Sequence, residues 1–320
     1  MTLLVVGSVA FDAVETPFGK RDRTLGGSAT FFSSAASYFS AVRLVAVVGK
    51  DFPKEHIDYL KSRGTDLAGL TVDPDGETFF WRGKYDYNLN DCQTLETRLN
   101  VFERFNPELP ADFRSSDYVF LANIDPVLQL RVLDQVKSPK LVAMDTMNFW
   151  INGKRADLLK VLARVDLLTI NDAEARALAE EPNLVKAAKK IFAMGPKLLV
   201  IKQGEYGALL FTPNEIFRAP AYPLESVFDP TGAGDSFAGG MLGHLASRGF
   251  DNKSDDKREL KQSLIAGSVL ASFAVEQFSI DRFRTLRSDE IQARYRDFHK
   301  LSHFDDVLPM PQGPAAKALA

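Results

Sequence analysis

Short apolar runs alternate along the chain with longer stretches in which apolar and polar residues mix. The runs are continuous and rich in Val, Leu and Ile, which is typical of strands buried on both faces of a parallel sheet. Predicted strands lie at residues 3–6, 44–48, 118–122, 141–144, 167–170 and 198–201. Predicted helices between them lie at residues 28–40, 55–63, 151–162 and 172–180. This alternation predicts an α/β fold in which helices cover a mostly parallel sheet.

Two segments interrupt this alternation. Residues 13–25 are polar and turn-rich, and residues 78–102 are aromatic and β-branched with a period of two. In a strand, this period separates two sets on opposite faces: Phe79, Trp81, Tyr85 and Tyr87 on one, and Phe80, Arg82, Lys84 and Asp86 on the other. We expect antiparallel strands that form a small sheet, which would act as a lid on the core. The alternative is a surface hairpin without a role in function.

The predicted organisation is therefore one domain over residues 1–308, with lid segments at about residues 13–25 and 78–102, followed by a loose C-terminal tail at residues 309–320. No internal repeat and no low-complexity block divides the chain.

Composition excludes several classes of protein. Hydrophobic residues make up 45% and charged residues 25% of the 320 residues, which are values of an ordinary globular protein. The net charge of −3 gives no indication of a nucleic-acid partner. A single cysteine, Cys92, excludes a disulfide within the chain and a zinc site built from cysteines. No segment has the length and hydrophobicity of a membrane span, and the start lacks a signal peptide's basic region, so we expect a cytoplasmic protein without membrane contact.

The segment from Asp229 to Gly240 reads DPTGAGDSFAGG and leads into a predicted helix. Small residues at a helix start let backbone N–H groups approach a ligand, and the positive end of the helix dipole favours phosphate there. Asp235 lies among these donors, where a carboxylate could accept the proton of a hydroxyl that attacks phosphorus. The alternative is a glycine-rich turn in which the aspartate caps the helix. A nicotinamide-dependent dehydrogenase is disfavoured, because no G-x-G-x-x-G follows a predicted strand.

This segment also resembles the C-terminal signature of the PfkB carbohydrate-kinase family, the ribokinase-like kinases. Further similar segments follow the family order: Gly26–Ala29, Val48–Asp51, Lys61–Asp66, Asn171–Glu174 and Lys202–Gly207. The resemblance covers roughly residues 3–285. It implies a ribokinase-like three-layer sandwich with a small β-sheet lid. It also implies an ATP-dependent kinase that phosphorylates a hydroxyl of a small polyol, either a sugar or a cyclitol. The alternatives are a nucleoside kinase of the same family and a catalytically silent member that binds a metabolite.

The resemblance assigns roles to individual residues. Asp235 resembles the general base, and Gly232, Ala233 and Gly234 resemble the anion hole. Asn171 and Glu174 resemble the pair that positions Mg²⁺, although they also fit the N-cap and third position of a helix. Asp229 and Thr231, with Ser279 as a weaker candidate, resemble ligands of a monovalent cation such as K⁺. The expected nucleotide contacts are Asn171, Lys202, Gly204, Gly207 and Thr231.

The expected contacts to the acceptor, a small molecule, are Asp12, Gly26, Gly27, Thr30, Phe31 and Arg82. A carboxylate such as Asp12 accepts hydrogen bonds from two neighbouring hydroxyls, and its alternative reading is a turn residue. Many sugar kinases of the family have Asn where this chain has Thr30-Phe31-Phe32, and the stretch is similar to inositol-kinase-like members. We therefore expect an acceptor with an apolar face, a cyclitol, or an acceptor whose polar contacts come from the lid. We also expect a homodimer formed through the lid.

Overall fold

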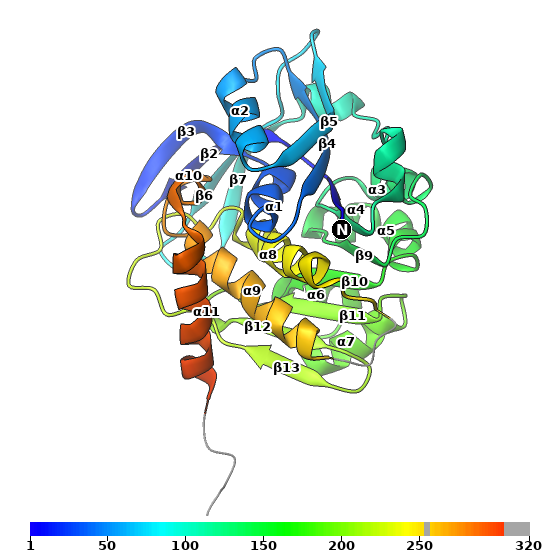
Figure 1. Cartoon of the computed structure of the whole chain (residues 1–320), viewed down its shortest axis with the longest axis vertical. Coiled ribbons are helices and arrows are strands. Elements are labelled where there is room, and N and C mark those ends of the chain that lie inside the picture. Colours follow the sequence, from blue (N-terminus) through cyan, green and yellow to red (C-terminus); the bar gives the residue numbers. More distant parts are fainter. Residues whose placement is uncertain (253–256, 304–320) are drawn as a thin grey trace, which may run out of the picture.

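The computed structural model describes residues 1–252 and 257–303, and its centre is a sheet of nine strands. The strand order is β13-β12-β11-β10-β9-β8-β1-β4-β5 (Figure 1). The strands are β1 (Leu3–Val6), β4 (Val42–Gly49), β5 (Thr65–Asp73), β8 (Tyr118–Leu121), β9 (Leu141–Met144), β10 (Leu167–Asn171), β11 (Leu198–Lys202), β12 (Ala208–Phe211) and β13 (Ile216–Ala219). Neighbours from β11 to β5 are parallel, and β12 and β13 add an antiparallel edge. The predicted, mostly parallel sheet is confirmed.

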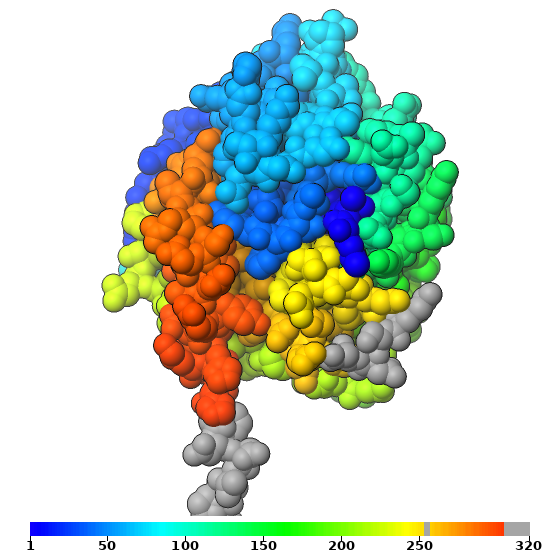
Figure 2. All heavy atoms as spheres, in the orientation of Figure 1, coloured from blue at the N-terminus to red at the C-terminus, as the bar shows by residue number. Residues whose placement is uncertain are grey.

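Helices cover both faces of this sheet and give the three layers that the sequence predicts. One face carries α1 (Ser28–Ala36), α2 (Lys54–Ser62), α8 (Ala233–Arg248), α9 (Arg258–Ala274), α10 (Asp281–Thr285) and α11 (Ser288–Ser302). The other carries α3 (Pro126–Leu133), α4 (Asn148–Gly153), α5 (Arg155–Leu162), α6 (Asp172–Ala179) and α7 (Leu184–Phe192). Strand β1 shows why both faces are apolar: Leu3 and Val5 belong to the first core, and Leu4 and Val6 to the second. Figure 2 shows α8, α9 and α11, in yellow to red, side by side on the surface of the first layer.

Three short 3₁₀ helices complete the assignment: η1 (Asn100–Arg104), η2 (Ala111–Ser115) and η3 (Gly204–Tyr206). The predicted helix at residues 151–162 is in fact two helices, α4 and α5, because the chain leaves the helical conformation at Lys154. The predicted C-terminal tail lies outside the described residues. Within the described ranges, no helix combines the length and the hydrophobicity needed to cross a membrane.

The second sheet is the predicted lid, with the order β3-β2-β6-β7. Its strands are β2 (Ala10–Thr16), β3 (Gly19–Gly26), β6 (Phe80–Tyr85) and β7 (Cys92–Arg98). Each hairpin is antiparallel, as predicted, but the two hairpins join through a parallel pair, β2 and β6. Strand β2 starts at Ala10, so Asp12 is part of the lid sheet rather than of a turn that precedes it.

Close helix packing fixes the position of α8. Its residue Gly239 faces α1, and a Cβ atom there would lie 2.3 Å from the carbonyl oxygen of Phe32. On the opposite side, a Cβ atom on Gly267 of α9 would lie 2.8 Å from the carbonyl oxygen of Phe237. Glycine at these positions lets the three helices approach to backbone contact, which holds the N-terminus of α8 at the carboxyl edge of the parallel strands.

Candidate active site

The first turn of α8 has the geometry of an anion-binding site. Gly232 is the N-cap and has a left-handed backbone conformation with a φ of 74°. A Cβ atom on Gly232 would lie 2.3 Å from Cγ of Phe31, so glycine is required there for conformation and for space. Because α8 begins at Ala233, the N–H groups of Gly234 and Asp235 have no acceptor within the helix. The Gly234 N–H group is therefore free to bind an anion, whereas the Asp235 N–H group interacts with the carboxylate of its own side chain.

Asp235 stands in this first turn beside a cation. Loss of hydration raises the pKa of its carboxyl group to about 6, and the Lys202 ammonium group acts in the opposite direction. The Lys202 Nζ atom lies at the N-terminus of α8, 2.8 Å from the position that a Cβ atom on Gly234 would take. A carboxylate with this pKa is ionised at neutral pH and is more basic than an ordinary aspartate, which suits a general base.

Asp12 faces the same space from the lid. Its Oδ2 atom accepts a hydrogen bond from the Gly27 N–H group at 3.4 Å, and a Cβ atom on Gly26 would lie 1.9 Å from that oxygen. Burial raises the pKa of Asp12 to about 7, and the charges of Asp229 and Asp235 add to the increase. The structure thus brings together Asp12, the glycine pair and Asp235, as expected from the sequence.

The loop before α8 is held by the carboxylate of Asp229. Its Oδ1 atom accepts the Thr231 N–H group at 2.9 Å, and its Oδ2 atom accepts the Ser279 N–H group at 3.1 Å. Burial raises the pKa of this carboxyl group, and the hydrogen bonds from Thr231 and Ser279 oppose the increase. The three candidate residues for a monovalent cation therefore lie in one cluster.

Asn171 and Glu174 form a reciprocal capping box at the start of α6. The Asn171 Oδ1 atom accepts the Glu174 N–H group at 2.7 Å, and the Glu174 Oε2 atom accepts the Asn171 N–H group at 2.8 Å. Burial raises the pKa of Glu174, and Lys202 opposes the increase. The capping alternative is therefore present, and it leaves the Oε1 atom of Glu174 outside the box.

The predicted metal ligands divide into two groups, with Asn171 and Glu174 beside Lys202, and Asp229 and Thr231 towards the lid. Within residues 1–252 and 257–303, no cluster of three or more His, Cys, Asp or Glu side chains could hold a metal ion. Mg²⁺ retains several waters and takes phosphate oxygens as ligands, so a site with few protein ligands fits its chemistry.

Sequence reasoning missed Asp145, which directly follows β9. This buried carboxyl group interacts with Asp235, Lys202 and Glu174. Burial raises its pKa strongly, and its Oδ1 atom has no hydrogen-bond partner among the described residues. A usable signal existed, since an aspartate at the carboxyl end of a predicted parallel strand lies at the same edge as Asn171 and Lys202.

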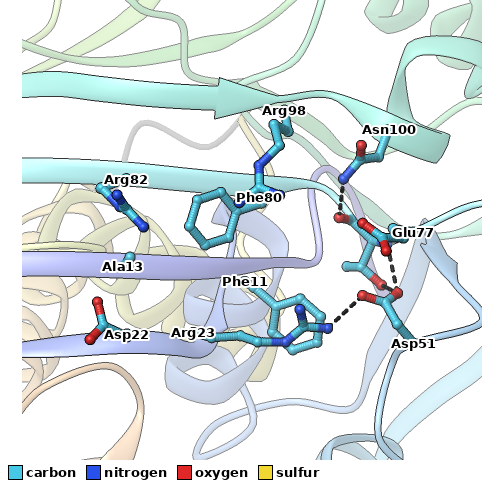
Figure 3. A pocket seen from close by; sticks show the side chains of 11 residues that line it. Phe11, Ala13, Asp22, Arg23, Asp51, Glu77, Phe80, Arg82, Arg98 and Asn100 are labelled. Atoms are coloured by element: carbon cyan, nitrogen blue, oxygen red, sulfur yellow. Dashed lines mark hydrogen bonds and ion pairs between the residues drawn. The ribbon is translucent and has the colours of Figure 1, made fainter.

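One predicted acceptor contact, Arg82, is not brought to this site. In the parallel pairing of β2 with β6, Asp12 lies opposite Trp81 and Ala13 opposite Arg82. Side chains alternate along a strand, so Arg82 projects from the face of the lid that is opposite to Asp12. There it lines a separate cavity of about 410 Å³ with Phe11, Phe80 and two other arginines (Figure 3). Thr30 is fully buried inside α1, and its hydroxyl has no hydrogen-bond partner among the described residues.

The backbone geometry of the turn after β11 favours glycine at two positions. Gly204 and Gly207 both have positive φ angles, 56° and 91°. A Cβ atom on Gly207 would lie 2.1 Å from the carbonyl oxygen of Ala219, whereas the space beside Gly204 is taken by Asn90 of the lid, with Oδ1 at 2.6 Å. The lid therefore reaches the core at Gly204, two residues after Lys202.

Comparison with known proteins identifies the family. Residues 3–282 match the pattern of the pfkB family carbohydrate kinases. The chain belongs to this family. It is therefore an ATP-dependent kinase, a phosphotransferase with an alcohol group as acceptor. This agrees with the resemblance carried by the segment around Asp235.

Named relatives and a solved structure extend the comparison. The chain is 32% identical to a cytidine kinase of Thermococcus kodakarensis over 250 residues, which are 76% of this chain and 87% of the relative. It is 30% identical to a nucleoside kinase of Methanothermobacter thermautotrophicus over 293 residues, 86% of this chain and 89% of the relative. The structure of a putative ribokinase II from E. coli with ATP and Mg²⁺ superposes with a TM-score of 0.73 at 19% identity, covering 92% of this chain and 99% of that one. This last likeness supports the ribokinase-like fold.

Proposed function

We propose that this PfkB-family kinase transfers the γ-phosphoryl group of ATP to a hydroxyl of a nucleoside. The proposal rests on one observation: the carboxyl groups of Asp12 and Asp235 face the same space at the N-terminus of α8. The ribose of a nucleoside offers two neighbouring hydroxyls to one carboxylate and a third hydroxyl for phosphorylation. The names of the cytidine and nucleoside kinases favour this alternative over the sugar or cyclitol that we expected first.

In the proposed reaction, Asp12 holds the acceptor in place beside the pair Gly26 and Gly27. The oxygen of one acceptor hydroxyl attacks the γ-phosphorus, and its proton passes to the carboxylate of Asp235. The bond between the γ-phosphorus and the oxygen bridging to the β-phosphorus breaks, so that ADP leaves. The free N–H group of Gly234, together with Gly232, Ala233 and Lys202, stabilises the charge on the transferred group.

Mg²⁺ supplies charge neutralisation on the phosphates of ATP. Glu174 and Asp145 are the acidic groups on the Lys202 side, and with Asn171 they would hold this ion through water. The partnerless Oδ1 atom of Asp145 fits this role, because a buried carboxylate oxygen needs a cation or a donor. Lys202, Gly204, Gly207 and Thr231 are the proposed contacts to the nucleotide.

An acceptor screen tests the proposal. ATP consumption with Mg²⁺ is measured on cytidine, other nucleosides, inositols, pentoses and hexoses, and we expect the highest kcat/KM with a nucleoside. The matched compound 2′,3′-dideoxycytidine keeps the base and the 5′-hydroxyl but lacks the two hydroxyls assigned to Asp12, so its KM should be much higher. Activity confined to sugars or inositols would restore the first interpretation. Activity on none of the compounds would contradict the nucleoside proposal.

We further propose a homodimer through the outer face of the lid and an activating K⁺ ion near Asp229, Thr231 and Ser279. The dimer is supported by the positively and negatively charged side chains on the face of the lid opposite to Asp12. On this face, Lys84 pairs with Glu15, and Arg82 lies 3.7 Å from Glu96. Light scattering on the Lys84→Glu variant tests the dimer, and an unchanged mass would contradict this interface.

The K⁺ site is tested by comparing rates in K⁺ and in a bulky organic cation at equal ionic strength. Equal rates would exclude the site.

A further inference from the structure

The second lid hairpin, β6 and β7, contacts the segment that leads into α8. We call residues 228–232 the α8 turn. The hydroxyl group of Tyr85, at the end of β6, forms a hydrogen bond of 3.2 Å with Thr231 Oγ1 in this turn. Beyond the strand, Asn90 of the same hairpin lies against Gly204. One hairpin therefore contacts both parts of the core that face the phosphates in the proposed function.

The first lid hairpin, β2 and β3, contacts the same turn independently. Thr16, the last residue of β2, donates its hydroxyl to the carbonyl oxygen of Phe228 at 2.9 Å. The ring of Phe18 lies edge-on to the ring of Phe228, with 6.0 Å between their centroids. Since Ser279 also donates its hydroxyl to the carbonyl oxygen of Leu25 at 2.5 Å, both hairpins are tied to the loops around Asp229.

The Tyr85 hydroxyl is buried between Thr231 of the α8 turn and Cys92 of its own hairpin. Burial raises its pKa well above the usual value, so the phenol stays protonated and neutral over the working range of the enzyme. Tyr87, two residues further along the same hairpin, is 88% exposed. Loss of the exposed Tyr87 hydroxyl therefore serves as the control for loss of the buried Tyr85 hydroxyl.

We propose that Tyr85 is a positioning residue that couples closure of the lid to the conformation of the α8 turn. The proposal rests on the proposed function of this turn in binding the transferred phosphoryl group. When the lid lies over the acceptor, the Tyr85 hydroxyl and Thr16 hold Thr231 and Phe228, and Gly232 follows directly in the chain. The anion-binding N–H groups of α8 are then aligned when the lid is closed. Phosphoryl transfer to water is disfavoured, because an open lid leaves the turn without these two supports.

Hydrogen exchange of backbone amides tests the coupling without a known acceptor. The probe is the non-hydrolysable analogue AMP-PNP with Mg²⁺, added to the full-length protein and to the variants Tyr85→Phe and Tyr87→Phe. In the wild type and in Tyr87→Phe, we expect the analogue to protect residues 232–240 and also the lid strands at residues 80–98. In Tyr85→Phe, protection of residues 232–240 should remain, whereas lid opening should increase about 2- to 13-fold, the equivalent of one neutral hydrogen bond.

The outcomes separate this inference from the proposed function. Equal protection of the lid in Tyr85→Phe and in the wild type would overturn the coupling and leave the function intact. Protection of residues 232–240 without protection of the lid in the wild type would do the same. No protection of either region in the wild type would overturn both. Thr16→Val keeps the shape of the side chain and removes both hydrogen bonds of the Thr16 hydroxyl, the one donated to Phe228 and the one accepted from the Phe18 N–H group. It should weaken lid protection in the same direction as Tyr85→Phe, and an unchanged lid would contradict the role given to this second support.

Once the screen has identified an acceptor, steady-state kinetics provide a second readout. Tyr85→Phe should lower kcat for transfer and raise the ratio of ATP hydrolysis to transfer, with little change in KM for ATP. A merely structural role would lower both rates together and leave that ratio unchanged, which would count against the inference.

Discussion

Asp235 owes its proposed chemistry to two opposing influences on one carboxyl group. Partial loss of water raises its pKa to about 6, and the ammonium group of Lys202 limits the increase. The first turn of α8 places this carboxylate beside the free N–H group of Gly234. A base and an anion-binding site are therefore built by the same few residues.

The variant Asp235→Asn should lose turnover and keep its fold. The amide preserves the size of the side chain but cannot take a proton, and general-base catalysis contributes roughly 100- to 10,000-fold. In the wild type, kcat/KM should fall as the pH drops below about 6, because Asp235 becomes protonated. Steady-state rates across pH, with circular dichroism as the control for folding, check both points. Near-normal turnover of the variant would remove Asp235 from the mechanism.

The variant Glu174→Gln separates the proposed role of Glu174 in holding Mg²⁺ from its role in capping α6. The amide oxygen can still accept the Asn171 N–H group, as Oε2 does now at 2.8 Å, so α6 should remain intact. The negative charge beside Lys202 is lost, and we expect a higher Mg²⁺ concentration for half-maximal rate. A Mg²⁺ titration of the rate measures this, with thermal unfolding as the control. An unchanged titration would leave Glu174 as a helix-start residue alone.

Local sequence explains which site residues could be predicted. Gly232 to Asp235 and the pair Gly26 and Gly27 are adjacent in the chain, so a short motif contains their geometry. The face on which Arg82 projects depends instead on the pairing of β2 with β6, which joins segments far apart in sequence. The link between Tyr85 and Thr231 spans 146 positions and depends on the same tertiary arrangement.

At the scale of elements, α8 is positioned by backbone contacts rather than by large side chains. The helix packs against α1 on one side and α9 on the other, with glycine at the closest points. The ring of Phe31 in α1 also contacts Gly232, so a change in the spacing of α1 and α8 alters the turn at the head of α8. Packing and catalysis are therefore coupled through one helix.

The variant Gly239→Ala tests this packing. Its methyl group would lie 2.3 Å from the carbonyl oxygen of Phe32, which is backbone and cannot move alone. Overpacking of this kind costs about 1–3 kcal/mol, and we expect a lower free energy of unfolding together with a lower kcat. The control is Gly153→Ala at the end of α4, where a Cβ atom meets nothing within 4 Å. Urea unfolding measures both variants, and equal stability of the two would contradict the argument.

Element prediction succeeded for the core strands that are buried on both faces and for the lid hairpins, and it failed at the edges of the large sheet. Every residue of β1, β8 and β9 is buried, which gives the continuous apolar runs of the sequence. Strand β5 at the sheet edge mixes buried and exposed positions, and its sequence TDLAGLTVD shows no such run, so it was not predicted. The parallel join of the two lid hairpins is likewise a property of tertiary contacts.

At the scale of the whole molecule, the site concentrates negative charge in a place with little water. The pKa values of Asp12, Asp145, Glu174 and Asp235 are all raised, with burial as the first cause. A folded state that binds protons more tightly than the unfolded chain loses stability as the pH rises. The protein should therefore be less stable at the pH at which its proposed base is ionised.

The variant Asp12→Asn isolates the contribution of one carboxyl group to this loss of stability at higher pH. The pKa of Asp12 is about 7 in the folded protein against 3.8 as the ordinary value, so its favourable contribution is complete below pH 3.8 and is lost as the pH rises through 7. At 1.36 kcal/mol for each unit, the loss amounts to about 4 kcal/mol. The amide side chain of the variant does not titrate, and its oxygen can still accept the Gly27 N–H group. The free energy of unfolding of Asp12→Asn should therefore increase relative to the wild type between pH 4 and pH 8, while KM for the acceptor rises. Urea unfolding at several pH values measures the difference, with Asp22→Asn, at an exposed position of β3, as the control. A difference that does not change with pH would show that Asp12 is ionised in the folded protein at low pH, and that the buried carboxylate does not limit stability.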